Sequence, residues 1–147
     1  MDNLHAFNQG ANVLAFEKNG VKYAATYAWA TQVGYEEVAF LQGEQSDTAH
    51  AIAIGDIVGI SALKEGQEAI AMEIGSTHST KTNKLKNIAY TQKGTAIIIP
   101  DAKVTMIAEC IDIIHLKGAE EDYFTVFKIL EAHDDTESSF LYGYFYD

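Results

Sequence analysis

The residues of this chain that could do chemistry begin in one short run near the N-terminal third. The run mixes small residues, hydroxyls, an amide and one large aromatic, in the order Thr26, Tyr27, Ala28, Trp29, Ala30, Thr31 and Gln32. Small side chains let backbone N–H groups approach a ligand, while hydroxyl and amide groups add hydrogen bonds. We therefore expect a wall for a flat ring with polar edges. The alternative interpretation is a tightly packed strand end, with Trp29 in the core.

A second polar group follows where a helix is expected to start. It consists of Gln45, Ser46, Asp47 and Thr48, directly before an apolar, alanine-rich stretch. The free N–H groups and the dipole at a helix start favour an anion such as a phosphate. Ser46 or Asp47 is also a good N-cap, and capping alone would explain the same residues without a ligand.

A polar loop over residues 75–86 supplies the third group, which consists of His78, Ser79, Lys81 and Lys84. The chain has no acidic residue between Glu73 and Asp101, although four lysines lie there. A basic region in an otherwise acidic chain could balance the charge of a phosphate. The alternative is a solvated loop that happens to be basic, and for His78 this is the simpler interpretation.

Composition excludes several classes of function. The net charge is −11, and lysine supplies all ten basic residues, so nucleic acid and anionic lipid would be repelled. The five histidines show no ligand spacing, so no metal site is expected. Cys110 is the single cysteine, which excludes an internal disulfide and suggests a reducing, cytoplasmic setting. No apolar run reaches the roughly 18 residues of a membrane span.

The pattern of the elements predicts one mainly β domain over residues 1–147. Asn19-Gly20 is typical of a two-residue hairpin turn, which would join strands over residues 11–18 and 21–28. Helices are expected over residues 48–54, ended by Gly55, and over 64–74, ended by Gly75. Few crossovers of the kind that parallel strands need are visible, so an antiparallel barrel is expected. Its further strands would cover residues 37–41, 56–63, 95–99, 103–116, 122–131 and 139–146.

Taken in order, four features resemble the flavin reductase-like family of FMN-binding split barrels. They are the run Ala25–Val33, the helix start Gln45–Thr48, the loop Ser79–Leu85 and the aromatic end Leu141–Tyr144. The resemblance implies a six-stranded antiparallel split β-barrel of the Greek-key type, with short inserted helices. It implies FMN as the cofactor, held by the three groups of residues named above, and it favours Lys84 as the lysine at the phosphate.

The same resemblance implies an oxidoreductase that passes a hydride from NADH or NADPH to flavin and on to an acceptor. It also implies a homodimer with the flavin at the subunit interface, to which residues 140–146 would add apolar area. The absence of arginine favours NADH, because a 2′-phosphate is usually bound by a bidentate guanidinium.

Two departures from the family pattern favour other functions. Gly34-Tyr35-Glu36-Glu37 stands where family members often have an acidic-Pro-Pro turn, and Tyr123 and Phe127 stand near a position that is often His. Both changes concern the nicotinamide side, so one alternative is an FMN-binding electron carrier or module without nicotinamide turnover. Another is a β-barrel interaction protein with no cofactor. A barrel like that of pyridoxamine-phosphate oxidase fits the order of the elements less well.

Overall fold

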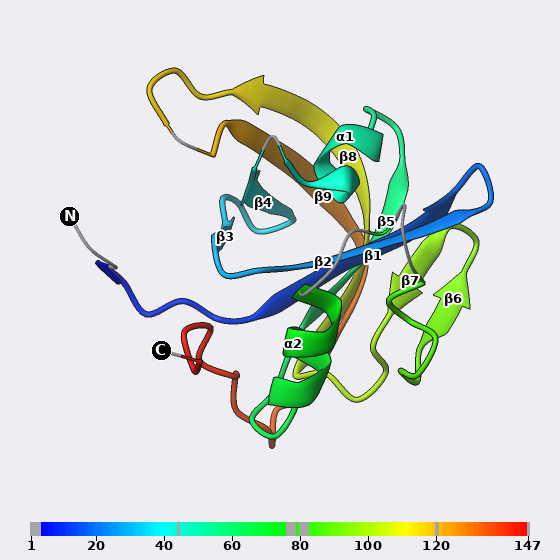
Figure 1. The fold of residues 1–147 in the computed structure, drawn as a ribbon, viewed down its shortest axis with the longest axis vertical. Helices are drawn as coiled ribbons and strands as arrows, with labels where there is room; N and C mark the ends of the chain where they lie inside the picture. Colours follow the sequence, from blue (N-terminus) through cyan, green and yellow to red (C-terminus); the bar gives the residue numbers. More distant parts are fainter. Residues whose placement is uncertain (1–3, 44, 76–78, 80–82, 120, 147) are drawn as a thin grey trace.

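The computed structural model describes residues 4–43, 45–75, 79, 83–119 and 121–146. Its centre is one strongly curved sheet in which every strand pair is antiparallel (Figure 1). The strand order is β3-β4-β9-β8-β5-β1-β7-β6, and β2 pairs with β1 off this path. The strands are β1 (Asn12–Lys18), β2 (Val21–Tyr27), β3 (Ala30–Gln32), β4 (Glu37–Gln42), β5 (Ile57–Ala62), β6 (Thr91–Lys93), β7 (Ala96–Ile98), β8 (Val104–His115) and β9 (Tyr123–Asp134).

The prediction of a mainly β, antiparallel split barrel is confirmed, although the described chain has nine strands and not six. The extra strands are short. β6 is three exposed polar residues, so it carries no alternation of apolar and polar side chains that a sequence pattern could reveal. β3 is likewise three residues long and lies beyond the strand expected over residues 21–28.

β1 is the strand around which the barrel splits. The turn at Asn19 and Gly20 has φ values of 53° and 80°, as the predicted hairpin requires, and returns the chain into β2. On its other side β1 pairs first with β5 and then, at Phe16, with β7. Room for this change of partner depends on Gly59, because a Cβ there would collide with the backbone of Ile97.

Both helices are shorter than the sequence predicts. α1 covers Asp47–Ala51, not residues 48–54, and Ile52 leaves it in an extended conformation to join the core. Gly55, with φ 96°, belongs to a later turn and does not cap the helix. α2 covers Glu68–Gly75 and not 64–74, because Gln67 closes a turn onto Lys64 and holds that part of the chain out of the helix.

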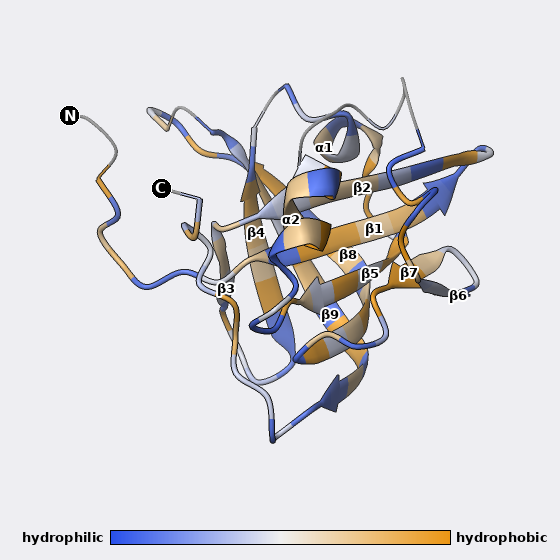
Figure 2. Ribbon diagram, turned by 60° about the horizontal axis from the view of Figure 1, so that its bottom comes forward, coloured by the Kyte–Doolittle hydropathy of each residue, from blue (hydrophilic) through white to orange (hydrophobic). Residues whose placement is uncertain are grey.

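Apolar side chains form two cores. Figure 2 shows in orange that much of the central strands consists of hydrophobic residues. One lies between the sheet, α2 and the C-terminal segment, and includes Ile74, Leu85 and Leu141. The other fills the barrel, where the rings of Phe40 and Phe127 meet edge to face at 5.9 Å. The two cores lie on opposite faces of β1, because successive side chains of a strand alternate between faces.

The C-terminal strand predicted over residues 139–146 is wrong. The segment forms isolated bridges from Phe140 to Lys64 and from Tyr142 to Gly10, and then turns. At Gly143 the chain packs so closely on the backbone of Gly10 that no side chain would fit. Its alternating aromatics therefore reflect packing on two different neighbours and not one continuous ladder. No helix in the described part of the chain is long and apolar enough to cross a membrane.

Candidate functional site

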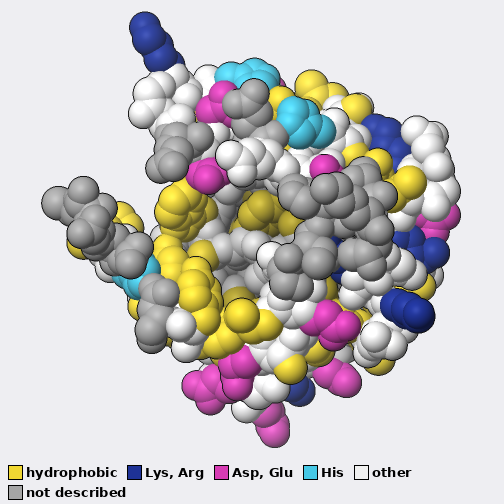
Figure 3. Space-filling model, viewed as in Figure 1, with side chains coloured by type: hydrophobic (Ala, Val, Ile, Leu, Met, Phe, Trp, Pro, Cys, Tyr) yellow, Lys and Arg dark blue, Asp and Glu magenta, His cyan; other side chains and the backbone are white. Residues whose placement is uncertain are grey.

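A cleft of about 390 Å³ opens between the end of β2 and the start of α1. Figure 3 shows the corresponding face of the molecule, hollowed between the two helices, with hydrophobic side chains gathered along one side. The lining combines small residues, hydroxyls, aromatics, two acids and one lysine. The lining residues are Ala25, Thr26, Tyr27, Ala28, Trp29, Leu41, Gly43, Gln45, Ser46, Asp47, Thr48, Gly75, Ser79, Lys84, Glu121, Tyr144 and Tyr146.

The cleft brings together most of the residues that the sequence singled out. Those on its wall are Thr26, Tyr27, Ala28, Trp29, Gln45, Ser46, Asp47, Thr48, Ser79 and Lys84. Ala30, Thr31 and Gln32 belong to the same predicted run, but the chain turns at Trp29, and these three line a different hollow inside the barrel. His78 and Lys81 lie outside the residues that the structure describes.

Sequence reasoning missed several lining residues. They include Leu41, Gly43, Gly75 and Glu121. The sequence predicts Tyr144 and Tyr146 in a strand at a subunit seam, whereas the structure places both on the wall of the cleft. No local pattern predicts that Glu121, Tyr144 and Tyr146 reach the cleft, because they are far in the sequence from the other lining residues.

The side chains of Ser79 and Lys84 both form hydrogen bonds with the backbone of Ala24, on the outer edge of β2. The Ser79 hydroxyl accepts a hydrogen bond from the Ala24 N–H at 3.0 Å and lies 3.2 Å from the Ala24 carbonyl oxygen. The Lys84 ammonium donates to the same carbonyl at 2.8 Å. Since β2 pairs only with β1, these two side chains satisfy backbone groups that no neighbouring strand reaches.

The charge of Lys84 is the main electrostatic feature of the cleft. Its side chain is buried, and burial lowers the pKa of the ammonium below the usual 10.5, an effect that Asp47 partly opposes. The ammonium has three N–H donors, and Ala24 takes one of them. A buried cation on the wall of a polar cleft is suited to binding an anionic group.

A chain of hydrogen bonds runs behind the cleft and joins three strands to α1. The Thr125 hydroxyl donates to Gln42 Oε1 at 2.8 Å, and Gln42 Nε2 donates to the Tyr27 hydroxyl at 2.8 Å. The Tyr27 hydroxyl lies 2.8 Å from that of Ser46, which caps α1 by accepting from the Ala49 N–H at 3.3 Å. Burial raises the pKa of Tyr27 to about 12, so the phenol stays protonated.

The alternative interpretation of Ser46 as a helix N-cap is therefore confirmed, since its hydroxyl caps α1. Ser46 also lines the cleft, so the cap and the lining are the same residue. Thr26 fixes the opposite side, because its hydroxyl donates to the Ala71 carbonyl of α2 at 3.0 Å.

Aromatic side chains border the mouth of the cleft. The Trp29 indole N–H donates to the Tyr144 hydroxyl at 2.7 Å, and the Tyr144 ring stacks on His5 with centroids 3.6 Å apart. Trp29 is 47% exposed, so the interpretation of this residue as core is wrong. The N-terminal and C-terminal segments thus meet beside the cleft and present apolar rings to it.

Other chemistries find no support in the described residues. They hold no group of three or more His, Cys, Asp or Glu side chains placed to bind a metal ion. Cys110 is buried, and burial raises the pKa of its thiol to about 11, which keeps it unreactive.

Comparison with known proteins places this cleft in a family context. A family model described as a flavin reductase like domain matches residues 4–143. A comparison with curated proteins gave no match. Among solved structures, the Streptomyces globisporus C-1027 NADH:FAD oxidoreductase SgcE6 superposes with a TM-score of 0.82 at 14% identity, covering 93% of this chain and 83% of that one.

Two further structures share the fold at similar identity. Flavoredoxin from Methanosarcina acetivorans gives a TM-score of 0.79 at 14% identity and covers 92% of this chain and 74% of its own. The FMN-binding protein from Thermus thermophilus with bound 1-cyclohex-2-enone gives 0.76 at 13%, with coverages of 88% and 72%. At these identities the structural likeness establishes the fold.

Proposed function

This chain belongs to the flavin reductase-like family, and on that premise we propose that it is a flavin-dependent oxidoreductase that binds FMN in the cleft between β2 and α1. The observation that carries the proposal is the pairing of a buried lysine with a wall of small residues and backbone at the end of β2. Lys84 is fixed to that wall through Ala24, so cation and wall form one rigid unit.

The residues present fit a flavin. Ala25, Ala28 and Gly75 leave room along the cleft, while Trp29 with the C-terminal tyrosines gives it an apolar border. Its volume of about 390 Å³ lies in the usual range for small-molecule sites, roughly 300–1,000 Å³. A pocket of this mixed character suits a planar ring system that continues into a polar chain.

We assign roles to the lining by chemistry. Lys84 would neutralise the phosphate, and Ser46 and Thr48 would offer hydroxyl donors to it at the start of α1. The backbone from Thr26 to Trp29 would orient the ring. Asp47 also lines the cleft, and its carboxylate would repel a phosphate unless a cation offset its charge. Lys84 would supply that cation, because Asp47 partly opposes the lowering of the lysine pKa by burial.

When bound, flavin supplies the redox chemistry of such proteins, taking a hydride from a reduced nicotinamide and passing electrons to an acceptor. The residues of this chain would bind, orient and partly shield the reacting group. We propose NADH over NADPH as the reductant, because the chain has no arginine for a 2′-phosphate. His78, Ser79 and Lys81 extend the proposed phosphate side on the basis of the sequence.

A second candidate is an FMN-binding electron carrier without nicotinamide turnover. One observation favours it: Tyr123, at a position near which relatives often have His, contacts the rings of His50 and His115 and does not line the cleft. Rapid mixing of the FMN-loaded protein with NADH in the absence of oxygen separates the two. Fast loss of flavin absorbance supports the reductase, whereas no reduction supports the carrier.

We also propose a homodimer and a cytoplasmic location. Exposed apolar side chains near the chain ends, including Leu4, Phe7 and Tyr146, offer apolar area for a subunit contact. Light scattering coupled to gel filtration would measure the mass; a single species of 16.1 kDa at micromolar concentration would contradict the dimer.

The test of the central proposal is the visible absorption spectrum of the purified protein, before and after addition of FMN and desalting. A retained flavin band supports the site. If no band is retained and titration shows no change in FMN fluorescence, the cleft does not bind FMN and the cofactor-free alternative is preferred.

A further inference from the structure

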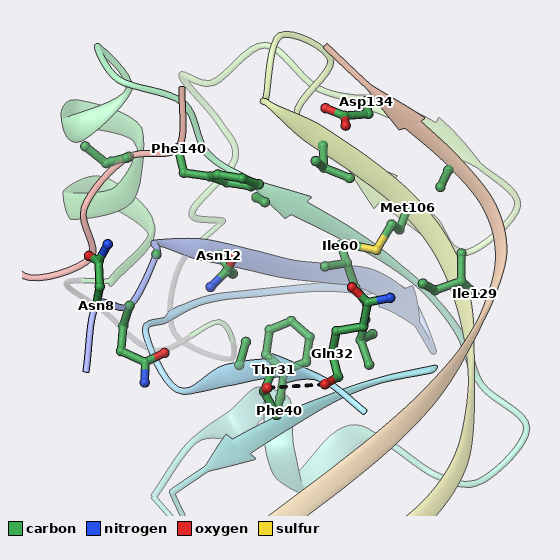
Figure 4. A pocket seen from close by; sticks show the side chains of 18 of the residues that line it. Asn8, Asn12, Thr31, Gln32, Phe40, Ile60, Met106, Ile129, Asp134 and Phe140 are labelled. Atoms are coloured by element: carbon green, nitrogen blue, oxygen red, sulfur yellow. Dashed lines mark hydrogen bonds between the residues drawn. The ribbon is translucent and has the colours of Figure 1, made fainter. Parts of the chain in front are cut away.

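A second and larger hollow, of about 810 Å³, opens at the far end of the barrel (Figure 4). Side chains from β1, β3, β4, β5, β8 and β9 surround it, and the segments around Asn8 and Phe140 border its mouth. In Figure 4 Phe40, Ile60, Met106 and Ile129 point into the space from different strands. It is a concave site within a single chain, enclosed by the curvature of the sheet.

The strand register explains why this end is hollow. Asn12, Ala62, Val104 and Asp134 are partners across four neighbouring strands and form one row at the mouth. Further in, rows carry larger residues, and the phenylalanines of the barrel core close the inner end. The smaller side chains at the mouth therefore leave space across the barrel, which aromatic rings fill deeper inside.

The hollow is separate from the β2–α1 cleft. The two share no lining residue, since Thr26–Trp29 face the cleft and Ala30–Gln32 face the hollow. Between them runs the turn after β2, held by a hydrogen bond from Asn12 Nδ2 to the Tyr27 carbonyl at 3.1 Å. A ligand in the hollow would thus lie behind the wall proposed for the flavin.

The charges on the lining of the hollow favour uncharged ligands over anions. The only charged residues on it are Glu65 and Asp134, and no basic residue lines the described surface. Lys103 pairs with Asp134 at 2.7 Å, so among the described lining residues Glu65 carries the remaining negative charge. The remaining polar groups are the neutral amides of Asn8, Gln9, Asn12 and Gln32 and the hydroxyls of Thr31 and Tyr142, around an apolar floor. An anion would be repelled, whereas an apolar body with a polar edge would be accommodated.

We propose that the open end of the barrel is a second ligand site, which binds an uncharged aromatic molecule. Phe40 and Met106 provide ring and sulfur contacts at the floor, and the amides at the mouth provide hydrogen bonds to a polar edge. The inference rests on this hollow alone and does not depend on flavin binding in the other cleft.

The experiment titrates the full chain with N-phenyl-1-naphthylamine, an uncharged probe whose fluorescence rises in apolar surroundings. 8-Anilinonaphthalene-1-sulfonate, which adds a sulfonate to the same ring system, is the charge control. We expect saturable binding of the uncharged probe at one site per chain, and at least about tenfold weaker binding of the sulfonate, equivalent to roughly 1.4 kcal/mol.

Two variants of β9 locate the bound probe. Ala132→Trp places an indole in the hollow and should weaken binding about tenfold or more, whereas His133→Trp places the same side chain on the opposite face and should leave it within about twofold. Both positions are exposed, so both variants should fold, which circular dichroism checks.

Several results would overturn the proposal. They are no saturable binding, equal binding of the two probes, equal effects of the two variants, or displacement of the probe by FMN in competition. Gel filtration with probe fluorescence tests a further occupant: binding only to a monomeric fraction would mean that a second copy of the chain fills the hollow.

Discussion

The Lys84 ammonium lies 2.8 Å from the backbone carbonyl oxygen of Ala24, sixty residues earlier in the chain. The contact fixes the one described cation of the cleft directly to β2, the strand whose end forms the cleft wall. A lysine on a free loop would lose side-chain entropy on binding an anion, whereas this one is already ordered.

Lys84→Met should weaken FMN binding about 10- to 100-fold, because a charged hydrogen bond contributes roughly 1.5–3 kcal/mol. Riboflavin, which lacks the phosphate, should lose much less. Fluorescence titration with both flavins measures the two affinities. Lys86→Met removes the same charge at an exposed position outside the cleft and is the control. Equal losses for FMN and riboflavin would show that Lys84 supports the fold and does not bind phosphate.

FMN affinity should depend on pH through the same residue. Burial lowers the pKa of Lys84 below 10.5, so its charge disappears at a lower pH than that of an exposed lysine. The ratio of FMN to riboflavin affinity should therefore fall as the pH rises through this lowered value, and Lys84→Met should show no such fall. Using the ratio removes the ionisation of the flavin ring, which both ligands share. A ratio that stays flat up to pH 10.5 would contradict the assignment.

Tyr27→Phe should lower the free energy of unfolding by about 1–3 kcal/mol, since the Gln42 amide would lose its buried acceptor. Urea unfolding measures the change, and Tyr35→Phe, at a side chain that is 99% exposed, is the control. The phenol pKa of about 12 in the folded protein exceeds the ordinary tyrosine pKa of 10.0. Between these values only the unfolded chain ionises, so stability should fall with rising pH there. Tyr27→Phe should remove this part of the slope.

Gly59→Ala should destabilise the fold by about 1–3 kcal/mol or more, because the added methyl group meets backbone atoms of Ile97, which cannot turn aside. Gly10→Ala is the matched control: its Cβ finds only ordinary contacts, and its φ is not positive. Thermal unfolding of both variants gives the comparison. Equal stability of the two would mean that β5 and β7 can move apart at this crossing.

Addition of FMN should quench the intrinsic tryptophan fluorescence, because Trp29 is the chain's only tryptophan and it lines the cleft. The quenching should saturate at one flavin per chain, and Lys84→Met should shift the curve to higher concentration. Free tryptophan at the same absorbance corrects for light absorbed by the flavin. A curve no steeper than this reference would place the bound flavin away from Trp29.

Much of the fold could be predicted because its signals are local. Asn19-Gly20 specifies a hairpin turn through its own backbone preference, and the long alternating segments of β8 and β9 specify strands. Thr26 to Trp29 could likewise be singled out by composition. The sequence could not show that the chain turns there and sends Ala30 into the barrel, because that turn depends on pairing with β4.

The failures share one cause, which is competition from distant partners. Alternating aromatics over residues 139–146 are typical of a strand, but Leu63 and Gln9 each take only part of the segment through hydrogen bonds. Residues 64–67 have a helical pattern, yet Gln67 folds back on Lys64. Glu121 precedes β9 and Tyr144 follows it, yet both reach the cleft, and no neighbouring residue in the sequence predicts this.

The side chains that clamp Ala24 have one more consequence, which concerns solubility. β2 is an outer strand, and its free N–H and C=O groups are a template on which a strand of another molecule could add. Ser79 and Lys84 occupy that template at a buried point, and Lys84 also carries a charge. Lys84, which we propose binds the cofactor, thus also disfavours the pairing of β2 with a strand of another molecule. Its loss should make the protein more prone to aggregate even where the fold itself survives.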